Sequence, residues 1–290
     1  MNRVDVMFSE LKAKNEGALM CYLPESGNNY HYSMEIVDAF VEGGVDMIEL
    51  CIPGTSPWLD GPPMQMHHLV DRENGINIER AFEMAAMVRA RYPHLPIMPM
   101  GYVSSVVRLG VERFVALAKA ADVDGFELPD YPSIKAGDPI GFHHMMRENN
   151  MWNVNFIDGI CLSPEGSPEF KLLRNILKDA HGFLFMTATA GVTGSTGEVA
   201  VEYLSRAIAR VREVQKIIEQ DTPVLVGFGL TRPEHVKQVI SIVKADAAVV
   251  GSAVSRLINQ HSDPGEIKDF IMELKKSTIR GGEVEAPGKN

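Results

Sequence analysis

Pro223-Val224-Leu225-Val226-Gly227-Phe228-Gly229 is a short apolar run that ends in a glycine-rich turn, and Ala247-Ala248-Val249-Val250-Gly251-Ser252-Ala253 repeats the pattern. A helical pattern follows each run. This arrangement is typical of the last two strand-to-helix turns of a (β/α)8 barrel, which together hold a phosphate group. Glycine lets the backbone approach an anion closely, and free N–H groups at a helix N-terminus attract negative charge. Tight turning alone would explain one such turn, but two at barrel spacing predict a small phosphorylated ligand.

The rest of the chain has the same alternation of apolar, β-rich runs with helical patterns, which predicts a parallel sheet in an α/β fold. From Leu204 to Ile218, apolar residues recur every three or four positions, which predicts a helix. A short helix near 3–14 is expected to cap the bottom of the barrel. The candidate strands are Ala18–Leu23, Met47–Ile52, Ile97–Gly101, Gly125–Pro129, Asn153–Ile157, Gly182–Thr187, Pro223–Gly227 and Ala247–Gly251.

The domain organisation follows from the same pattern. Val45–Leu50 and Val123–Leu128 both read Val-Asp-x-x-Glu-Leu, which fits a barrel built from similar units. No low-complexity linker divides the chain, so we expect residues 1–280 to form a single TIM-barrel domain. Residues 281–290 are rich in Gly, Glu, Pro and Lys, and we expect a flexible C-terminal tail.

Composition narrows the classes of protein to consider. The chain has 290 residues, of which 45% are hydrophobic and 23% charged, which suits one domain with a substantial core. Its formal net charge of −10 and the lack of a basic run argue against nucleic-acid binding. Neither a signal peptide nor a membrane-spanning run is evident. The scattered Cys21, Cys51 and Cys161 indicate reduced core residues in a cytoplasmic protein, with no zinc site.

Glu49 is the first candidate for chemistry, because active sites of this fold lie where strands end at the carboxyl face. It stands in the apolar strand end Ile48–Pro53. Burial disfavours the ionised form, so the pKa of Glu49 should rise, and a raised pKa suits proton exchange near neutrality. A structural pairing with an Arg or Lys inside the barrel would explain the residue equally well.

Two loops add further candidates. The stiff loop Pro53–Pro63 carries Asp60, which is either a turn former or a second carboxylate that faces Glu49 across the site. The segment Thr187–Gly197 is small, hydroxylated and rich in glycine, which favours a mobile lid with backbone donors for an anion. A surface loop without function is the alternative for that segment.

Taken in order, these motifs resemble the tryptophan synthase alpha subunit family over nearly the whole chain. The resemblance implies a (β/α)8 barrel that cleaves indole-3-glycerol phosphate to indole and glyceraldehyde 3-phosphate without a cofactor, and that can meet a beta subunit. The motifs are Glu49-Leu50-x-x-Pro53, Pro57-x-x-Asp60-Gly61-Pro62, Gly191-Val192-Thr193-Gly194, Gly227-Phe228-Gly229 and Gly251-Ser252-Ala253.

The resemblance also implies roles for individual residues. Glu49 would exchange protons with indole C3 and with the glycerol hydroxyl. Asp60 would accept the indole N–H and stabilise positive charge on the ring, and Tyr102 and Asp130 would support the site. The residues expected around the phosphate are Thr193, Gly194, Phe228, Gly229, Gly251 and Ser252. The residues expected around the ring are Tyr22, Met100, Tyr102, Glu127, Pro129, Asp130 and Phe185.

The ring pocket departs from the family pattern. Glu127 and Pro129 stand where apolar or small residues are usual, Tyr22 replaces a phenylalanine and Phe185 a tyrosine. Asn155 is a further polar residue counted with this pocket. Thr189 replaces an arginine of the lid, and Gly54 and Ser56 replace a phenylalanine and an aspartate of the loop that normally meets the beta subunit.

Because a buried carboxylate is costly, Glu127 must be paired, protonated or turned towards a polar ligand. A lyase or aldolase that acts on a phosphorylated substrate with a more polar head group is therefore an alternative function. A non-catalytic subunit that binds a phosphorylated metabolite is another, and a sugar-phosphate isomerase is a third, because fold does not fix function. The adjacent pairs His67-His68 and His143-His144 do not form metal chelates by themselves, since neighbouring side chains on a helix diverge.

Overall fold

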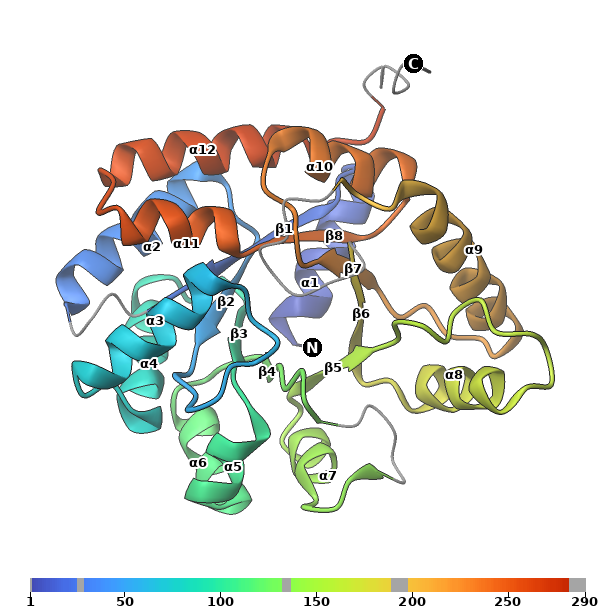
Figure 1. Ribbon diagram of the computed structural model, residues 1–290, viewed down its shortest axis with the longest axis horizontal. Coiled ribbons are helices and arrows are strands. Elements are labelled where there is room, and N and C mark those ends of the chain that lie inside the picture. The colour runs from blue at the N-terminus through green and yellow to red at the C-terminus, as the bar shows by residue number, and fades with distance from the viewer. Residues whose placement is uncertain (1, 25–28, 132–136, 189–197, 282–290) are drawn as a thin grey trace.

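The computed structural model describes residues 2–24, 29–131, 137–188 and 198–281. Within these ranges, eight parallel strands alternate with helices and form the barrel that the sequence predicts (Figure 1). Neighbouring strands follow the order β3-β2-β1-β8-β7-β6-β5-β4. The strands are β1 Ala18–Leu23, β2 Met47–Cys51, β3 Ile97–Met100, β4 Gly125–Phe126, β5 Trp152–Phe156, β6 Gly182–Thr187, β7 Val224–Gly227 and β8 Ala247–Val250.

The barrel closes at a seam between β3 and β4. Met100 and Glu127 form a parallel bridge there. The Glu127 N–H donates to the Pro99 carbonyl at 2.9 Å, and the Gly101 N–H donates to the Glu127 carbonyl at 3.0 Å. The backbone of Glu127 is therefore fixed between the two strands, which sets the direction of its side chain.

Most predicted strands agree with the structure to within one residue at each end. The exception is β4, because the sequence predicts a strand that reaches Pro129 whereas β4 ends at Phe126 and only the bridge at Glu127 extends it. Proline has no N–H to donate to a ladder. The predicted end of this strand is therefore wrong.

Alternation along the strands divides the core into two layers. On β1, Leu19, Cys21 and Leu23 belong to the layer between strands and helices, whereas Ala18 and Met20 fill the barrel interior. Successive side chains of a strand point to opposite faces, so every strand contributes to both layers. The outer layer is packed mainly by Ile, Val, Leu, Ala and Phe.

Helices surround the strands as an outer ring (Figure 1). They are α2 Tyr30–Gly43, α3 Pro62–Glu73, α4 Ile78–Arg91, α5 Val103–Leu109, α6 Val111–Ala120, α7 Phe142–Glu148, α8 Pro168–Asp179, α9 Val201–Ile217, α10 Pro233–Lys237, α11 Ser252–Asn259 and α12 Pro264–Lys276. A further helix, α1 Arg3–Ala13, lies outside this ring. A π-helical turn, Gln238–Ile242, continues α10. No helix in the described part of the chain is long and apolar enough to cross a membrane.

The first helix, α1, closes the amino-terminal mouth of the barrel. Val4, Met7 and Leu11 recur at helical spacing and are buried with the interior layer of the barrel. Asn2 caps the helix through its side chain, and Asp5 completes the capping box. The predicted cap at the bottom of the barrel is confirmed, which leaves the opposite, carboxyl end open for a site.

Candidate active site

Three buried carboxylates meet at the carboxyl end of the barrel. Glu49 lies on β2, Glu127 follows β4, and Asp60 lies in the loop after β2. The chain neighbours of both glutamates belong to the layer that faces the helices, so both glutamate side chains point into the barrel. Each of the three carboxylates is at most 3% exposed. The structure thus brings the two predicted catalytic residues to one place together with Glu127.

The acids at the other end of the barrel differ, because they are paired. Aspartates stand immediately before β2, β4 and β8, and each accepts a hydrogen bond from a backbone N–H of the adjacent strand. Each also forms an ion pair, which is the arrangement expected of structural buried charges. The pairs are Asp46 with Lys275 at 2.7 Å, Asp124 with Arg89 at 2.6 Å, and Asp246 with Arg212.

By contrast, neither Glu49 nor Glu127 forms an ion pair with any residue that the structure describes. Burial, and then repulsion from Asp60, raises the pKa of Glu49 to about 8. Burial, and then repulsion from Glu49 and Asp60, raises the pKa of Glu127 well above its usual range. Glu49 can therefore hold or release a proton near neutral pH. A pairing of Glu49 with Arg or Lys inside the barrel is excluded within the described ranges.

Hydrogen bonds fix Asp60 in the site. The Tyr102 hydroxyl donates to Asp60 Oδ2 at 3.0 Å, and His68 Nε2 lies 3.0 Å from the same oxygen. The Gly54 N–H donates to His68 Nδ1 at 2.9 Å. Because Nδ1 accepts this bond, the proton of a neutral His68 sits on Nε2, where it is donated to Asp60. Asp60 is thus more than a turn former.

Gly54 makes room for this arrangement. A Cβ atom at position 54 would lie 3.3 Å from Cδ2 of Tyr102 and 3.9 Å from Nδ1 of His68. The contact with Tyr102 would be tight, whereas the distance to His68 is an ordinary contact. Glycine at this position therefore leaves the Tyr102 ring uncrowded beside Asp60.

The two histidines of α3 have separate roles. His67 Nε2 donates to the Ser255 carbonyl at 3.2 Å, and burial lowers the pKa of His67 to about 4. His68 instead bonds Asp60 and Gly54. The two rings have different partners, as the divergence of neighbouring helical side chains predicts.

Apolar side chains form the walls beside the acids. Tyr22, Cys51, Met64, Met100 and Tyr102 pack as one buried cluster at this end of the barrel. Tyr22 and Met100, both predicted to line the ring pocket, belong to this cluster. A pocket between such apolar walls and the aromatic side chains of the opposite strands suits a planar aromatic ring.

The opposite wall is a set of three phenylalanines. The ring centroids of Phe156 and Phe185 are 5.1 Å apart, and those of Phe185 and Phe228 are 5.2 Å apart. The Phe228 side chain therefore lies with the ring pocket, whereas only its backbone belongs to the turn predicted to hold phosphate. A Cβ atom on Gly227 would lie 2.5 Å from Cζ of Phe185, so glycine is required there.

Three pocket predictions need separate comment. Asn155 does not face the pocket, because its side chain points away from the barrel interior and donates to the backbone carbonyls of Asn153 and Phe183 at 3.3 Å; its assignment to the ring pocket is wrong. Pro129 and Asp130 are half-buried just beyond β4. Asp130 supports the site indirectly, because its Oδ1 accepts the Val103 N–H, at 2.9 Å, at the start of α5.

The predicted phosphate turns have the expected backbone geometry. Phe228 and Gly229 have φ of 57° and 105°, which is the left-handed region that favours glycine. α11 begins at Ser252 directly after β8, so its N-terminal N–H groups lie at the carboxyl end of the barrel. A Cβ atom on Gly251 would lie 3.2 Å from Sδ of Met64. The predicted lid residues Thr193 and Gly194 lie outside the described residues, as does Thr189.

Sequence reasoning missed His68, Phe156 and Met64. The partner of His68 lies eight positions back, across a loop, where helical spacing gives no signal. Phe156 had a usable signal, since Trp152, Val154 and Phe156 alternate on β5 and fill the interior. A methionine in the sequence is usually interpreted as core packing. The structure shows that Sδ of Met64 lies 3.8 Å from the Ser252 hydroxyl.

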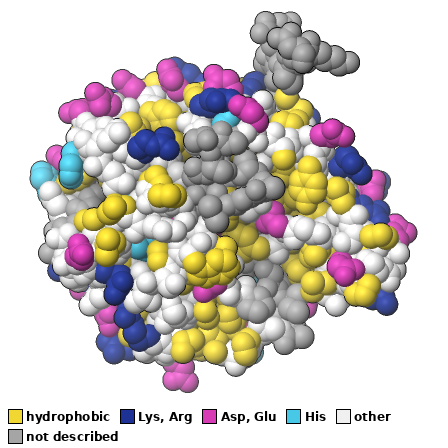
Figure 2. All heavy atoms as spheres, viewed as in Figure 1, with side chains coloured by type: hydrophobic (Ala, Val, Ile, Leu, Met, Phe, Trp, Pro, Cys, Tyr) yellow, Lys and Arg dark blue, Asp and Glu magenta, His cyan; other side chains and the backbone are white. Residues whose placement is uncertain are grey.

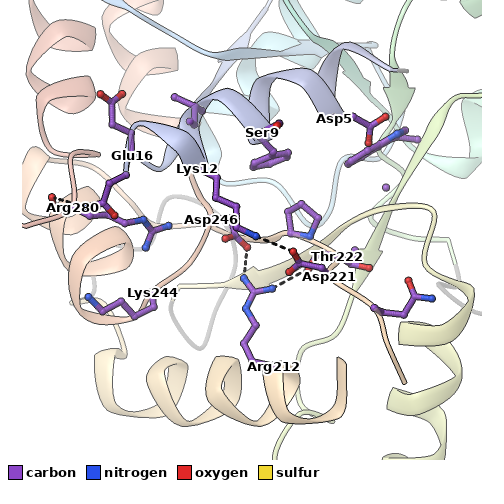
Figure 3. Close-up of a pocket in the computed structure, with 17 residues that line it drawn as sticks. Asp5, Ser9, Lys12, Glu16, Arg212, Asp221, Thr222, Lys244, Asp246 and Arg280 are labelled. Atoms are coloured by element: carbon purple, nitrogen blue, oxygen red, sulfur yellow. Dashed lines mark hydrogen bonds and ion pairs between the residues drawn. The ribbon is translucent and has the colours of Figure 1, made fainter. Parts of the chain in front are cut away.

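A cavity of about 710 Å³ lies at the opposite end of the molecule, beside α1 (Figure 3). Its charged side chains are largely engaged with one another: Arg212 pairs with Asp246, and Lys12 Nζ lies 3.0 Å from Asp221 Oδ2. Arg280 donates to the carbonyl of Ala245 in the loop before β8 and to that of Ile240 in the π-helical turn. Active sites of this fold lie at the carboxyl face of the barrel, whereas the amino-terminal face serves stability. The cavity is therefore not the candidate site.

The fold and the site define a (β/α)8-barrel protein with an acid–base pair at its carboxyl face. The family model for the tryptophan synthase alpha chain matches residues 8–281. The chain therefore belongs to the tryptophan synthase alpha chain family.

Similar proteins agree with this assignment. The chain is 30% identical to a tryptophan synthase alpha chain from Aquifex aeolicus, over 95% of this chain and 98% of that protein. It is 32% identical to another from Desulfatibacillum aliphaticivorans, over 96% and 97%. A solved structure from Aquifex aeolicus is similar with a TM-score of 0.82 and 28% identity, covering 97% of this chain and all of that one. A Mycobacterium tuberculosis tryptophan synthase chain shares the fold, with a TM-score of 0.79 and 24% identity.

Proposed function

We propose that this protein is a carbon–carbon lyase that cleaves indole-3-glycerol phosphate to indole and glyceraldehyde 3-phosphate. The observation that carries the proposal is the pair Glu49 and Asp60, buried at the carboxyl end of the barrel without a Lys or Arg partner among the described residues. Membership of the family supports the same reaction.

Glu49 would begin the reaction in its protonated form. Because its pKa is raised to about 8 by burial and by Asp60, it can give its proton to indole C3 at neutral pH. The ring then carries a positive charge at its nitrogen. The resulting Glu49 carboxylate takes the proton of the hydroxyl on the adjacent glycerol carbon, the C–C bond breaks, and its electrons neutralise the ring. Glu49 regains its proton, and indole and an aldehyde leave.

Asp60 would stabilise the charge that develops on the ring. Its carboxylate accepts the indole N–H, and His68 and Tyr102 hold it in place through Oδ2. An acceptor fixed before the reaction needs no reorganisation when the charge appears. The phosphate would bind at the turn around Gly229 and at the N-terminus of α11, with Thr193 and Gly194 as further proposed contacts.

We also propose that a tryptophan synthase beta subunit docks on the face that carries the Asp60 loop. Trp58 in that loop and Met66 and Leu69 on α3 are exposed apolar residues, with Trp58 61% exposed. In the face seen in Figure 2, hydrophobic side chains form several patches that lie among polar and charged ones. Apolar residues that stay exposed mark interaction sites. We propose a cytoplasmic location, which the free thiols of the three cysteines support.

The test is indole release by the purified protein supplied with indole-3-glycerol phosphate. Wild type should release indole, and Glu49→Gln and Asp60→Asn should each abolish turnover while a non-cleavable substrate analogue still binds. Intact binding without turnover in wild type would instead identify a non-catalytic subunit. Binding to a beta subunit should weaken in Trp58→Ala, measured by calorimetry.

A further inference from the structure

Of the three buried carboxylates, Glu127 is the one to which the proposed reaction gives no role. Its side chain is 1% exposed, and neither carboxyl oxygen has a hydrogen-bond partner among the residues that the structure describes. No ion pair within those ranges reaches it. An unpartnered buried polar group costs free energy unless something supplies its hydrogen bonds.

The fold aims this carboxyl group at the ring pocket. Glu127 bridges Met100 at the closure seam, and Met100 belongs to the cluster that lines one wall. The next strand, β5, contributes Phe156 of the other wall. Glu127 therefore stands between the two walls, on the inner face of the barrel, where a ring would lie.

No side chain in the described ranges pairs with Glu127. Asp124 stands immediately before β4 and forms ion pairs with Arg89 and Arg3, as a buried acid with a structural role is expected to do. No three His, Cys, Asp or Glu side chains in the described ranges are arranged to hold a metal ion. The partner of Glu127 is thus expected from a ligand.

We propose that Glu127 is a specificity-determining residue that hydrogen-bonds to a hydroxyl group on the six-membered ring of the substrate. The inference rests on the proposed function and names its substrate class: indole-3-glycerol phosphate hydroxylated on the ring, in preference to the unsubstituted compound.

The chemistry favours a hydroxyl over other groups. Burial, and then repulsion from Glu49 and Asp60, favours the neutral form of Glu127, and that form offers an O–H donor and a carbonyl acceptor. The only polar group of the indole ring is its N–H, which Asp60 takes in the proposed reaction. A ring hydroxyl both accepts and donates, so it can satisfy both oxygens of Glu127. A methyl group of similar size satisfies neither.

Calorimetric binding to the purified, full-length protein tests the proposal. The probe is indole-3-propyl phosphate, which lacks the glycerol hydroxyls and is not cleaved, prepared with a hydroxyl or a methyl group at each of the four carbons of the six-membered ring that can carry one. At one position the hydroxyl compound should bind wild type about tenfold more tightly than its methyl counterpart. Glu127→Leu should abolish that ratio, and Glu127→Gln, which keeps a donor and an acceptor, should retain part of it.

Equal ratios in wild type and Glu127→Leu, or the lack of a hydroxyl preference at every position, would overturn the proposal. Glu127→Gln keeps the test valid if the leucine variant folds poorly. The proposed function is judged separately, by indole release from the unsubstituted substrate. Turnover with a flat binding ratio would refute the role of Glu127 alone. A hydroxyl preference without turnover of either the unsubstituted or the ring-hydroxylated substrate would refute the lyase alone.

Discussion

Replacing His68 by leucine should lower the rate of cleavage without weakening substrate binding. Asp60 Oδ2 has two donors, each at 3.0 Å, from His68 and Tyr102. His68 is 1% exposed, so water does not readily replace the lost donor. A buried hydrogen bond to a charged group is worth about 1.5–3 kcal/mol. At about 1.4 kcal/mol per factor of ten, kcat should fall about 10- to 100-fold.

The assay is steady-state indole release, with kcat and KM measured separately. KM should change little, because His68 bonds Asp60 and Gly54 and makes no hydrogen bond to the turns proposed for phosphate. Tyr102→Phe removes the other donor to the same oxygen and should give a loss of similar size. His68→Gln keeps a side-chain donor and should recover part of the rate.

His67→Leu is the matched control, since it removes a histidine of the same helix that bonds only the Ser255 carbonyl in the described structure. Its kcat should stay near that of wild type. If His68→Leu turned over as fast as wild type, or if His67→Leu lost as much rate, the positioning of Asp60 by His68 would be refuted.

Three further outcomes are expected. Folding raises the pKa of Glu49 from 4.5 to about 8, so the folded protein keeps a proton that the unfolded chain loses, and stability falls as pH rises between these values. In Glu49→Gln, urea titrations should lack this contribution, at most about 1.4 kcal/mol per pH unit. Asp124→Asn breaks a buried ion pair and should cost about 3–5 kcal/mol, whereas Glu127→Gln removes an unpaired acid and should leave the melting temperature unchanged or raised. Gly227→Ala places a Cβ atom 2.5 Å from the buried Phe185 ring, so thermal unfolding should show a loss of about 1–3 kcal/mol.

The strands and the burial of the predicted acids could be inferred from local pattern. Apolar runs end at glycine or proline, so β1 and β6 match residue for residue. Glu49 stands out among the apolar neighbours of its strand and Asp60 stands in a stiff loop beside it, and both are buried. The Val-Asp-x-x-Glu-Leu echo also has a physical reason. Its aspartates are the paired acids before β2 and β4, and its glutamates are the two that point into the barrel.

What escaped prediction depends on contacts between distant segments. His68 is defined by Asp60 and Gly54, which a helical pattern does not reveal. Asn155 was placed on the wrong face, because in a strand a slip of one residue exchanges inside for outside. Phe228 was predicted from the glycines beside it, while its ring packs with Phe185. The proposed partner of Glu127 is a group on the ligand, which the sequence does not reveal.

The most direct measurement is a crystal structure of the protein with bound indole-3-propyl phosphate. The account predicts that the phosphate lies against Gly229 and the N-terminus of α11, the ring nitrogen faces Asp60, and ring carbon C3 faces Glu49. A phosphate bound elsewhere, such as in the cavity beside α1, or a ring outside the reach of both acids, would contradict it.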